Sequence, residues 1–119
     1  MDGMPRTVLI VDDHAEFRRV ARVVLEADAF DVVGEAANGV TAVAEVVRLR
    51  PELVLLDVQL PDLDGFEVAS LLAALAEPPR VILTSSRPAE SFRRRLASSS
   101  ALGFIPKNDL SGSALAAFV

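Results

Sequence analysis

The chain has 119 residues, carries a formal net charge of -5 and is 51% hydrophobic, which is the composition of one globular domain. It has no cysteine, so disulfides and thiolate metal sites are excluded, and its acidity and lack of Trp and Tyr argue against direct nucleic-acid binding. The start of the chain is too acidic for a signal peptide and no apolar run is long enough to span a membrane, so we expect a cytoplasmic protein without membrane contact.

The first predicted strand covers residues 7–11, an apolar run that ends at Asp12 and Asp13. A helix is predicted over residues 15–27, because its apolar residues recur with helical spacing while the opposite face is charged. Its predicted inward stripe consists of Phe17, Val20, Ala21, Val24 and Leu25.

The second predicted strand covers residues 30–36 and is interrupted by Asp31 and Gly34, which is typical of an edge strand. Residues 38–39 are Asn-Gly and predict a turn, and a second helix follows that ends before Pro51. The predicted inward stripe of this helix is Val40, Val43, Ala44 and Val47.

The third predicted strand, residues 53–57, is a continuous apolar run that ends in an aspartate. Such a run without polar alternation favours a strand buried on both faces of a parallel sheet. Asp64 and Glu67 have the spacing of a capping box, which predicts a third helix over residues 65–76.

A fourth strand is predicted at residues 80–84, and a fourth helix that carries the basic run 93–95 begins near Pro88. A short fifth strand is predicted at 103–107 and a last short helix within 110–119. This strict alternation of strand and helix predicts a doubly wound α/β domain with a parallel sheet and helices on both faces.

Polar residues follow four of the predicted strands, where the carboxyl ends of parallel strands meet at one edge. Three carboxylates in that place repel one another, and a divalent cation would relieve the repulsion. Ligands that are all oxygen favour Mg²⁺, which leaves one aspartate free to attack phosphorus while a lysine and a hydroxyl bind the added charge. The residues concerned are Asp12, Asp13, Asp57, Thr84 and Lys107.

This pattern resembles the receiver domain of two-component response regulators, and the resemblance covers the whole chain. It implies a flavodoxin-like five-stranded sheet of order 2-1-3-4-5 with five helices, and a single receiver domain over residues 1–119. The matching motifs are Val11-Asp12-Asp13, Leu56-Asp57, Leu60-Pro61, Asp64-Gly65, Leu83-Thr84-Ser85 and Gly103-Phe104-Ile105-Pro106-Lys107.

The resemblance also implies the role of each site residue. Asp57 would accept a phosphoryl group from a sensor histidine kinase or a phosphotransfer protein, with Thr84 and Lys107 assisting. Thr84 and Phe104 would be the switch residues, and Gln59 and Ser86 would tune dephosphorylation. The implied Mg²⁺ ligands are Asp12, Asp13, Asp57 and the backbone carbonyl of Gln59.

The implied output is a change in a protein-interaction face that acts on a downstream protein or an output domain, with homodimerisation as a possibility. The motif Gly103–Lys107 is similar to the branch that carries helix-turn-helix output domains, yet about one helix follows Lys107 and we expect no output domain in this chain. Alternatives are the regulatory part of a transcription factor and a pseudo-receiver that serves as a binding scaffold.

Rival classes meet specific objections. A phosphohydrolase that uses Asp57 as a transient nucleophile would need a carboxylate two residues later, where this chain has Gln59. A nucleotide binder of similar fold would need glycine in the first turn, which reads Asp-Asp-His-Ala. We therefore expect no enzymatic activity beyond the domain's own phosphorylation and dephosphorylation.

Three further features leave alternatives open. We expect His14 to be solvated at a helix start, and Arg93–Arg95 to form either a solvated helix face or a partner contact. The family's lysine is often followed by a proline in a cis bond, whereas Asn108 follows Lys107 here, so the loop after the fifth strand is expected to differ.

Overall fold

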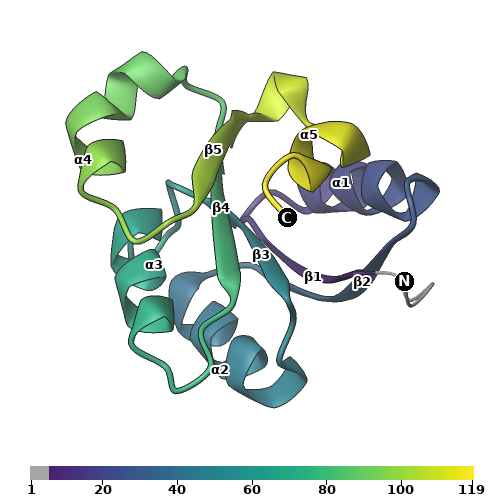
Figure 1. The fold of residues 1–119 in the computed structure, drawn as a ribbon, viewed down its shortest axis with the longest axis horizontal. Coiled ribbons are helices and arrows are strands. Elements are labelled where there is room, and N and C mark those ends of the chain that lie inside the picture. Colours follow the sequence, from purple (N-terminus) through teal and green to yellow (C-terminus); the bar gives the residue numbers. More distant parts are fainter. Residues whose placement is uncertain (1–5) are drawn as a thin grey trace.

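The computed structural model describes residues 6–119 and contains a five-stranded parallel sheet in the order β2-β1-β3-β4-β5 (Figure 1). The predicted order is thereby confirmed; the N-terminal residues that argued against a signal peptide lie mostly outside the described part. The strands are β1 (Arg6–Val11), β2 (Phe30–Ala36), β3 (Leu53–Asp57), β4 (Arg80–Ser85) and β5 (Gly103–Pro106). The helices are α1 (Ala15–Ala27), α2 (Gly39–Leu49), α3 (Gly65–Ala73), α4 (Arg93–Ala97) and α5 (Gly112–Ala116), with 3₁₀-helices η1 (Ala89–Phe92) and η2 (Lys107–Asp109).

Helices cover both faces of the sheet, with α1 and α5 on one side and α2, α3 and α4 on the other (Figure 1). Alternate strand residues point to opposite faces, so Val8 and Ile10 pack towards α1 and α5 while Leu9 and Val11 pack towards α2 and α3. All five residues of β3 are buried, as its continuous apolar run predicts. Within residues 6–119, no helix combines the length and apolar character needed to cross a membrane.

β2 lies at the edge of the sheet, as predicted, and its pairing with β1 is irregular. Val8 pairs with Val32 and the next residue, Leu9, pairs with Gly34, so β2 contains one extra residue at this point. A Cβ atom on Gly34 would lie 2.8 Å from Cδ1 of Leu49, so the glycine makes room for the end of α2. The bulge and the glycine thus let α2 pack closely on this edge.

The predicted inward stripe of α2 is wrong except at Val43, which is half-buried and packs against the core. Val40 and Val47 are 66% and 59% exposed, while Ala42 and Val46 are buried. Apolar residues surround most of this helix, so the helical period alone does not choose a face. Packing against α3 decides it, because a Cβ on Gly39 would come within 2.9 Å of Val68, and only the small-residue face can approach so closely.

α3 has the predicted capping box between Asp64 and Glu67, but it ends at Ala73 and not at 76. The fourth helix is split into the 3₁₀-helix η1 and a short α-helix, α4. The last helix covers Gly112–Ala116, a short helix within the predicted range 110–119. On α1, whose bounds match the prediction, Val20 is 47% exposed and does not belong to the buried stripe.

Candidate functional site

The carboxyl ends of β1 and β3, which are neighbours in the sheet, bring the predicted acidic residues together. One ligand atom from each of Asp12, Asp13, His14 and Asp57 lies within 4.8 Å of the others. Asp12 is fully buried and Asp57 is 3% exposed, whereas Asp13 lies at the surface. The cluster therefore has a buried floor and an open rim through which a ligand can enter.

Lys107 follows β5 directly and reaches back across the sheet edge into this cluster. Its Nζ lies 2.6 Å from Asp12 Oδ2 and 3.2 Å from Asp57 Oδ2, and 4.6 Å from the centre of the Phe17 ring. Burial alone would lower the pKa of Lys107, but contact with Asp12 and the charge of Asp57 outweigh burial and raise it. The lysine is thus a fixed positive charge that offsets part of the carboxylate repulsion.

Asp57 ionises less readily than an ordinary aspartate. Burial of the carboxylate, reinforced by the charge of Asp12, raises the pKa of Asp57 to about 6. The backbone N–H of Gln59, which donates to Asp57 Oδ1 at 3.1 Å, and the charge of Lys107 act in the opposite direction. Asp57 is nonetheless ionised at neutral pH, which is the form that a nucleophile requires.

The loop between β3 and α3 is held tightly against the strand end. The N–H of Gly65 donates to the carbonyl of Val58 at 2.7 Å, and a Cβ on Gly65 would lie 2.4 Å from the carbonyl oxygen of Asp57. Asp62 accepts hydrogen bonds from the N–H groups of Gly39 and Val40, which attaches the loop to the start of α2. These contacts fix the backbone on which Asp57 and Gln59 stand.

His14 is closer to the cluster than the sequence indicated. Its side chain is exposed, as expected, but Nδ1 lies 3.0 Å from Asp12 Oδ1 and 3.1 Å from Asp13 Oδ1. The backbone N–H of His14 donates to Asp12 Oδ1 at 2.8 Å. The signal that could have identified this contact is the position of the histidine directly after the two aspartates, at the N-cap of α1.

The predicted switch residues lie on β4 and β5. Thr84 pairs with Asp57 in the strand register and is fully buried, and its Oγ1 has no hydrogen-bond partner among residues 6–119. Phe104 is half-buried, and its ring centre lies 6.0 Å from that of Phe92, which in turn is 6.1 Å from Phe66. A buried hydroxyl without a partner is costly, so Thr84 has a donor available for a ligand.

Gln59 and Ser86, the predicted tuning positions, are both exposed beside the strand ends. The basic run on α4 is not a uniform solvated face, because Arg95 pairs with Asp64 and lies 4.2 Å over the Phe66 ring. The described residues contain no cis peptide bond, and the chain continues from Lys107 into η2.

The donor set fits a hard divalent cation. Asp12, Asp13 and Asp57 offer carboxylate oxygens within one cluster, and Mg²⁺ prefers one or two carboxylates together with waters and phosphate oxygens. The single positive charge of Lys107 does not neutralise three carboxylates. The residues present therefore suit Mg²⁺, with the carbonyl of Gln59 as a further predicted ligand.

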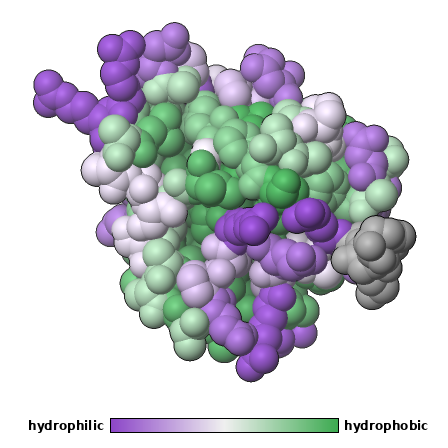
Figure 2. All heavy atoms as spheres, in the orientation of Figure 1, coloured by the Kyte–Doolittle hydropathy of each residue, from purple (hydrophilic) through white to green (hydrophobic). Residues whose placement is uncertain are grey.

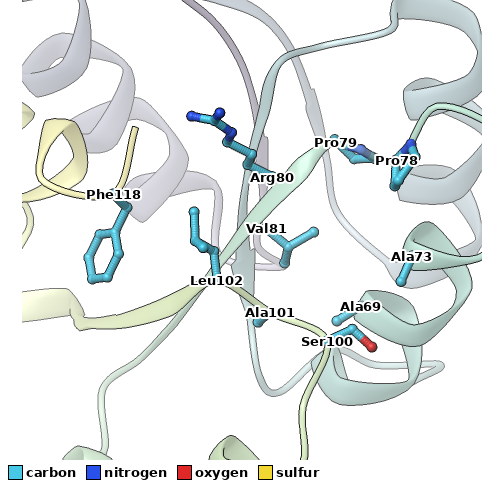
Figure 3. A pocket seen from close by; sticks show the side chains of 10 residues that line it. All are labelled: Ala69, Ala73, Pro78, Pro79, Arg80, Val81, Ser100, Ala101, Leu102 and Phe118. Atoms are coloured by element: carbon cyan, nitrogen blue, oxygen red, sulfur yellow. The ribbon is translucent and has the colours of Figure 1, made fainter.

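A second hollow, of about 520 Å³, lies away from the cluster, where β4 begins (Figure 3). It extends from α3 past the start of β4 to Phe118, and its walls are mostly apolar. Arg80 and Ser100 supply its polar side chains, and it includes none of the predicted site residues.

Fold and cluster together define a doubly wound α/β domain with an acidic cluster at the carboxyl edge of its sheet that could hold a metal ion. The model of the response regulator receiver domain matches residues 8–116, so the chain belongs to the family of response regulator receiver domains. Over 106 residues the chain is 40% identical to the virulence factors putative positive transcription regulator BvgA of Bordetella pertussis, which covers 89% of this chain and 51% of BvgA. The chain thus spans about half the length of this curated relative.

Solved structures of receiver domains have the same fold as this chain. The signal receiver domain of the putative response regulator NarL from Mycobacterium tuberculosis superposes with a TM-score of 0.85 at 28% identity, covering 97% of both chains. The structure titled as the CheX-CheY-BeF3-Mg+2 complex from Borrelia burgdorferi gives a TM-score of 0.84 at 26% identity, covering 98% of this chain and 87% of that one.

Proposed function

We propose that this domain is a Mg²⁺-dependent phosphoacceptor switch in which Asp57 receives a phosphoryl group from a sensor histidine kinase or a phosphotransfer protein. The observation that carries the proposal is the position of Asp57, buried at the end of β3 beside two further carboxylates and 3.2 Å from Lys107 Nζ. The CheX-CheY-BeF3-Mg+2 complex from Borrelia burgdorferi, a solved relative of the same family, supports this assignment.

Each site residue would have a separate role in phosphoryl transfer. A carboxylate oxygen of Asp57 attacks the phosphorus atom, and the bond from phosphorus to the donor nitrogen breaks. Lys107 Nζ pairs with the transferred phosphoryl group, and Thr84 Oγ1 donates the hydrogen bond for which it has no partner. Mg²⁺, held by Asp12, Asp13, Asp57 and the Gln59 carbonyl, would supply charge neutralisation at the phosphoryl oxygens.

The consequence of phosphorylation would be a rearrangement at β4 and β5. Movement of Thr84 towards Asp57 opens space beside Phe104, whose ring is in contact range of Phe92 on η1. Figure 2 shows hydrophilic side chains projecting from the α4 corner and hydrophobic ones gathered over β5 and α5. This face would meet the downstream protein, the output domain or a second copy of the domain.

We propose no turnover of external substrates, because position 59 is glutamine and not a proton-shuttling carboxylate. Exposed Gln59 and Ser86 would instead set how fast water removes the phosphoryl group. Similarity to BvgA, which is described as a transcription regulator, favours the alternative in which the domain regulates a DNA-binding output. A stand-alone cytoplasmic receiver that acts through protein contact, and a scaffold that acts unphosphorylated, are the other outcomes.

Intact-mass measurement after incubation with acetyl phosphate tests the proposal. We expect a gain of one phosphoryl group that requires Mg²⁺, is abolished by EDTA and is absent in Asp57→Asn. Asp31→Asn, which changes an exposed aspartate on β2 away from the cluster, is the matched control and should still be phosphorylated. Unchanged mass of the wild-type protein, both here and with a phosphohistidine donor, would overturn the proposal and favour the scaffold.

A further inference from the structure

A partly buried network of ion pairs and hydrogen bonds connects α1 and β2 to the acidic cluster. Arg18 Nη1 donates to the backbone carbonyl of Asp12 at 2.6 Å, and its Nε donates to Glu35 Oε1 at 3.0 Å. Arg22 Nε donates to the other Glu35 oxygen at 2.9 Å and Arg22 Nη1 to the carbonyl of Val32 at 3.2 Å. Glu35 is therefore clamped between two arginines, and one of them reaches the metal-binding turn.

The carbonyl that Arg18 holds has a special position. It belongs to the planar peptide that joins Asp12 to Asp13, so fixing its direction restricts the rotation on either side of that peptide. The N–H of Asp12 is also occupied, since it donates to the carbonyl of Ala36 at 3.0 Å. The side chain of Asp13, the exposed carboxylate of the cluster, thus starts from a backbone that Arg18 orients.

The ion pair between Arg18 and Glu35 is less exposed to solvent than an ordinary surface ion pair. The Arg18 side chain is 18% exposed and that of Glu35 is 30% exposed, whereas Arg19 and Glu16, one residue along the same helix, are 69% and 73% exposed. The hydrogen bonds from Arg22 and Arg18 outweigh burial and hold the pKa of Glu35 below its ordinary value. The Glu35 carboxylate thus favours its anionic form and orients the Arg18 guanidinium through the hydrogen bond from Arg18 Nε.

We infer that Arg18 is a positioning residue for the divalent-cation site and that Glu35 holds Arg18 in place. Arg18 contacts neither the cation nor the phosphoryl group; it acts through the Asp12–Asp13 peptide. The inference rests on the proposed function, because it assigns a residue to the Mg²⁺ site of that switch. Outer contacts that orient metal ligands typically change metal affinity by about 10–100-fold when they are lost.

Loss of the Arg18 charge and loss of its positioning role would change Mg²⁺ affinity in opposite directions, so the two effects can be told apart. Arg18 is a positive charge near a cation site, so removing it would by charge alone tighten Mg²⁺ binding. If Arg18 orients the Asp12–Asp13 turn, its removal weakens binding. A residue that only stabilises the fold would leave the affinity of the folded protein unchanged.

The test is the Mg²⁺ dissociation constant of the unphosphorylated protein, measured by isothermal titration calorimetry with circular dichroism to verify folding. We expect Arg18→Ala to weaken Mg²⁺ binding about tenfold. Arg18→Lys keeps the charge but not the two-pronged geometry, so we expect a smaller loss. Arg19→Ala, which breaks the exposed pair with Glu16, should stay within about twofold of wild type.

Glu35→Gln provides a second route if Arg18→Ala does not fold. It leaves the guanidinium in place but weakens its anchor, and we expect a loss of Mg²⁺ affinity together with a shift of the Asp13 amide resonance in the cation-free protein. Arg18→Lys and Glu35→Gln both at wild-type affinity, or a folded Arg18→Ala that binds Mg²⁺ equally well or more tightly, would overturn the inference.

The wild-type titration separates this inference from the proposal on which it rests. Wild-type protein that neither binds Mg²⁺ nor takes up a phosphoryl group would overturn both. Wild-type protein that does both, with Arg18→Ala retaining full Mg²⁺ affinity, would overturn only the role assigned to Arg18.

Discussion

Lys107 Nζ lies closer to Asp12 Oδ2, at 2.6 Å, than to Asp57 Oδ2, at 3.2 Å. Lys107, which would pair with the phosphoryl group, is therefore paired mainly with Asp12, a predicted Mg²⁺ ligand, in this structure. Binding of Mg²⁺ near Asp12 would compete with that pair and release Lys107 towards Asp57. Cation binding and lysine placement would thus be coupled through the buried carboxylate of Asp12.

Replacement of Lys107 tests how much this positive charge stabilises the site. In Lys107→Met, two buried carboxylates lose their common cation, and breaking a buried pair in this way costs about 3–5 kcal/mol. We expect a loss of this order in urea unfolding with EDTA at pH 7, and partial recovery with Mg²⁺. Stability equal to wild type in EDTA would contradict the assigned pairing.

The raised pKa of Asp57 predicts the pH dependence of stability. Its pKa is about 6 in the folded protein and near 3.8 in the unfolded chain, so the folded state binds this proton more tightly. Stability from this group is therefore greatest at low pH and declines as pH rises from about 4 to 6, by on the order of 3 kcal/mol.

Asp57→Asn removes that titration. In EDTA, urea unfolding should show the variant to be more stable than wild type at pH 7.5, with the difference vanishing near pH 4. Asp62, whose pKa is lowered by the N–H groups of Gly39 and Val40, gives the opposite sign: stability that it contributes is lost as pH falls. A wild-type protein as stable as Asp57→Asn at pH 7.5 would show that burial does not penalise the carboxylate.

Removal of the Thr84 hydroxyl should stabilise the folded protein but impair its response to phosphorylation. Its buried Oγ1 has no partner in the described residues, so Thr84→Val removes an unsatisfied hydroxyl without changing shape, and we expect about 1 kcal/mol of added stability in thermal unfolding. We expect phosphorylation to shift the Phe104 resonances of the wild type but not those of Thr84→Val. A destabilised Thr84→Val would indicate that the hydroxyl is already bonded.

A side chain at Gly65 should destabilise the protein and disturb the site. A Cβ there would meet backbone atoms, the Asp57 carbonyl oxygen at 2.4 Å and Val58 Cα at 2.8 Å, so the strand end or helix start must shift. We expect Gly65→Ala to cost about 1–3 kcal/mol and to slow phosphoryl uptake, measured by chemical unfolding and intact mass. Gly34→Ala is the control, since its nearest contact is the flexible end of Leu49, and it should leave uptake unchanged.

The strands and the acidic cluster were predictable from sequence for one physical reason. Each strand is an apolar run broken by a polar residue, and parallel strands must place those residues at one edge, so Asp12, Asp57 and Thr84 could be placed together. Lys107 could be added because the motif around β5 matches the family. The particular pairing of Lys107 with Asp12 depends on side-chain reach across the fold, which no spacing reveals.

Other features depend on packing. The period of α2 fits two faces, and the close approach of Gly39 to Val68 selects the one that the pattern did not. The contact of Arg18 with the Asp12 carbonyl was missed because arginine on a charged helix face has the same pattern whether it is solvated or bonded. The extra residue in β2 is likewise set by how the strand fits β1, not by composition.

Mapping the phosphoryl group to one residue tests the central claim most directly. After incubation with acetyl phosphate and Mg²⁺, borohydride reduces an aspartyl phosphate to an alcohol, and peptide mass spectrometry then locates the reduced side chain. We expect one Mg²⁺-dependent reduction at Asp57 and none at Asp12, Asp13 or Asp62. Reduction at another aspartate with Asp57 unmodified would show that Asp57 is not the phosphoacceptor.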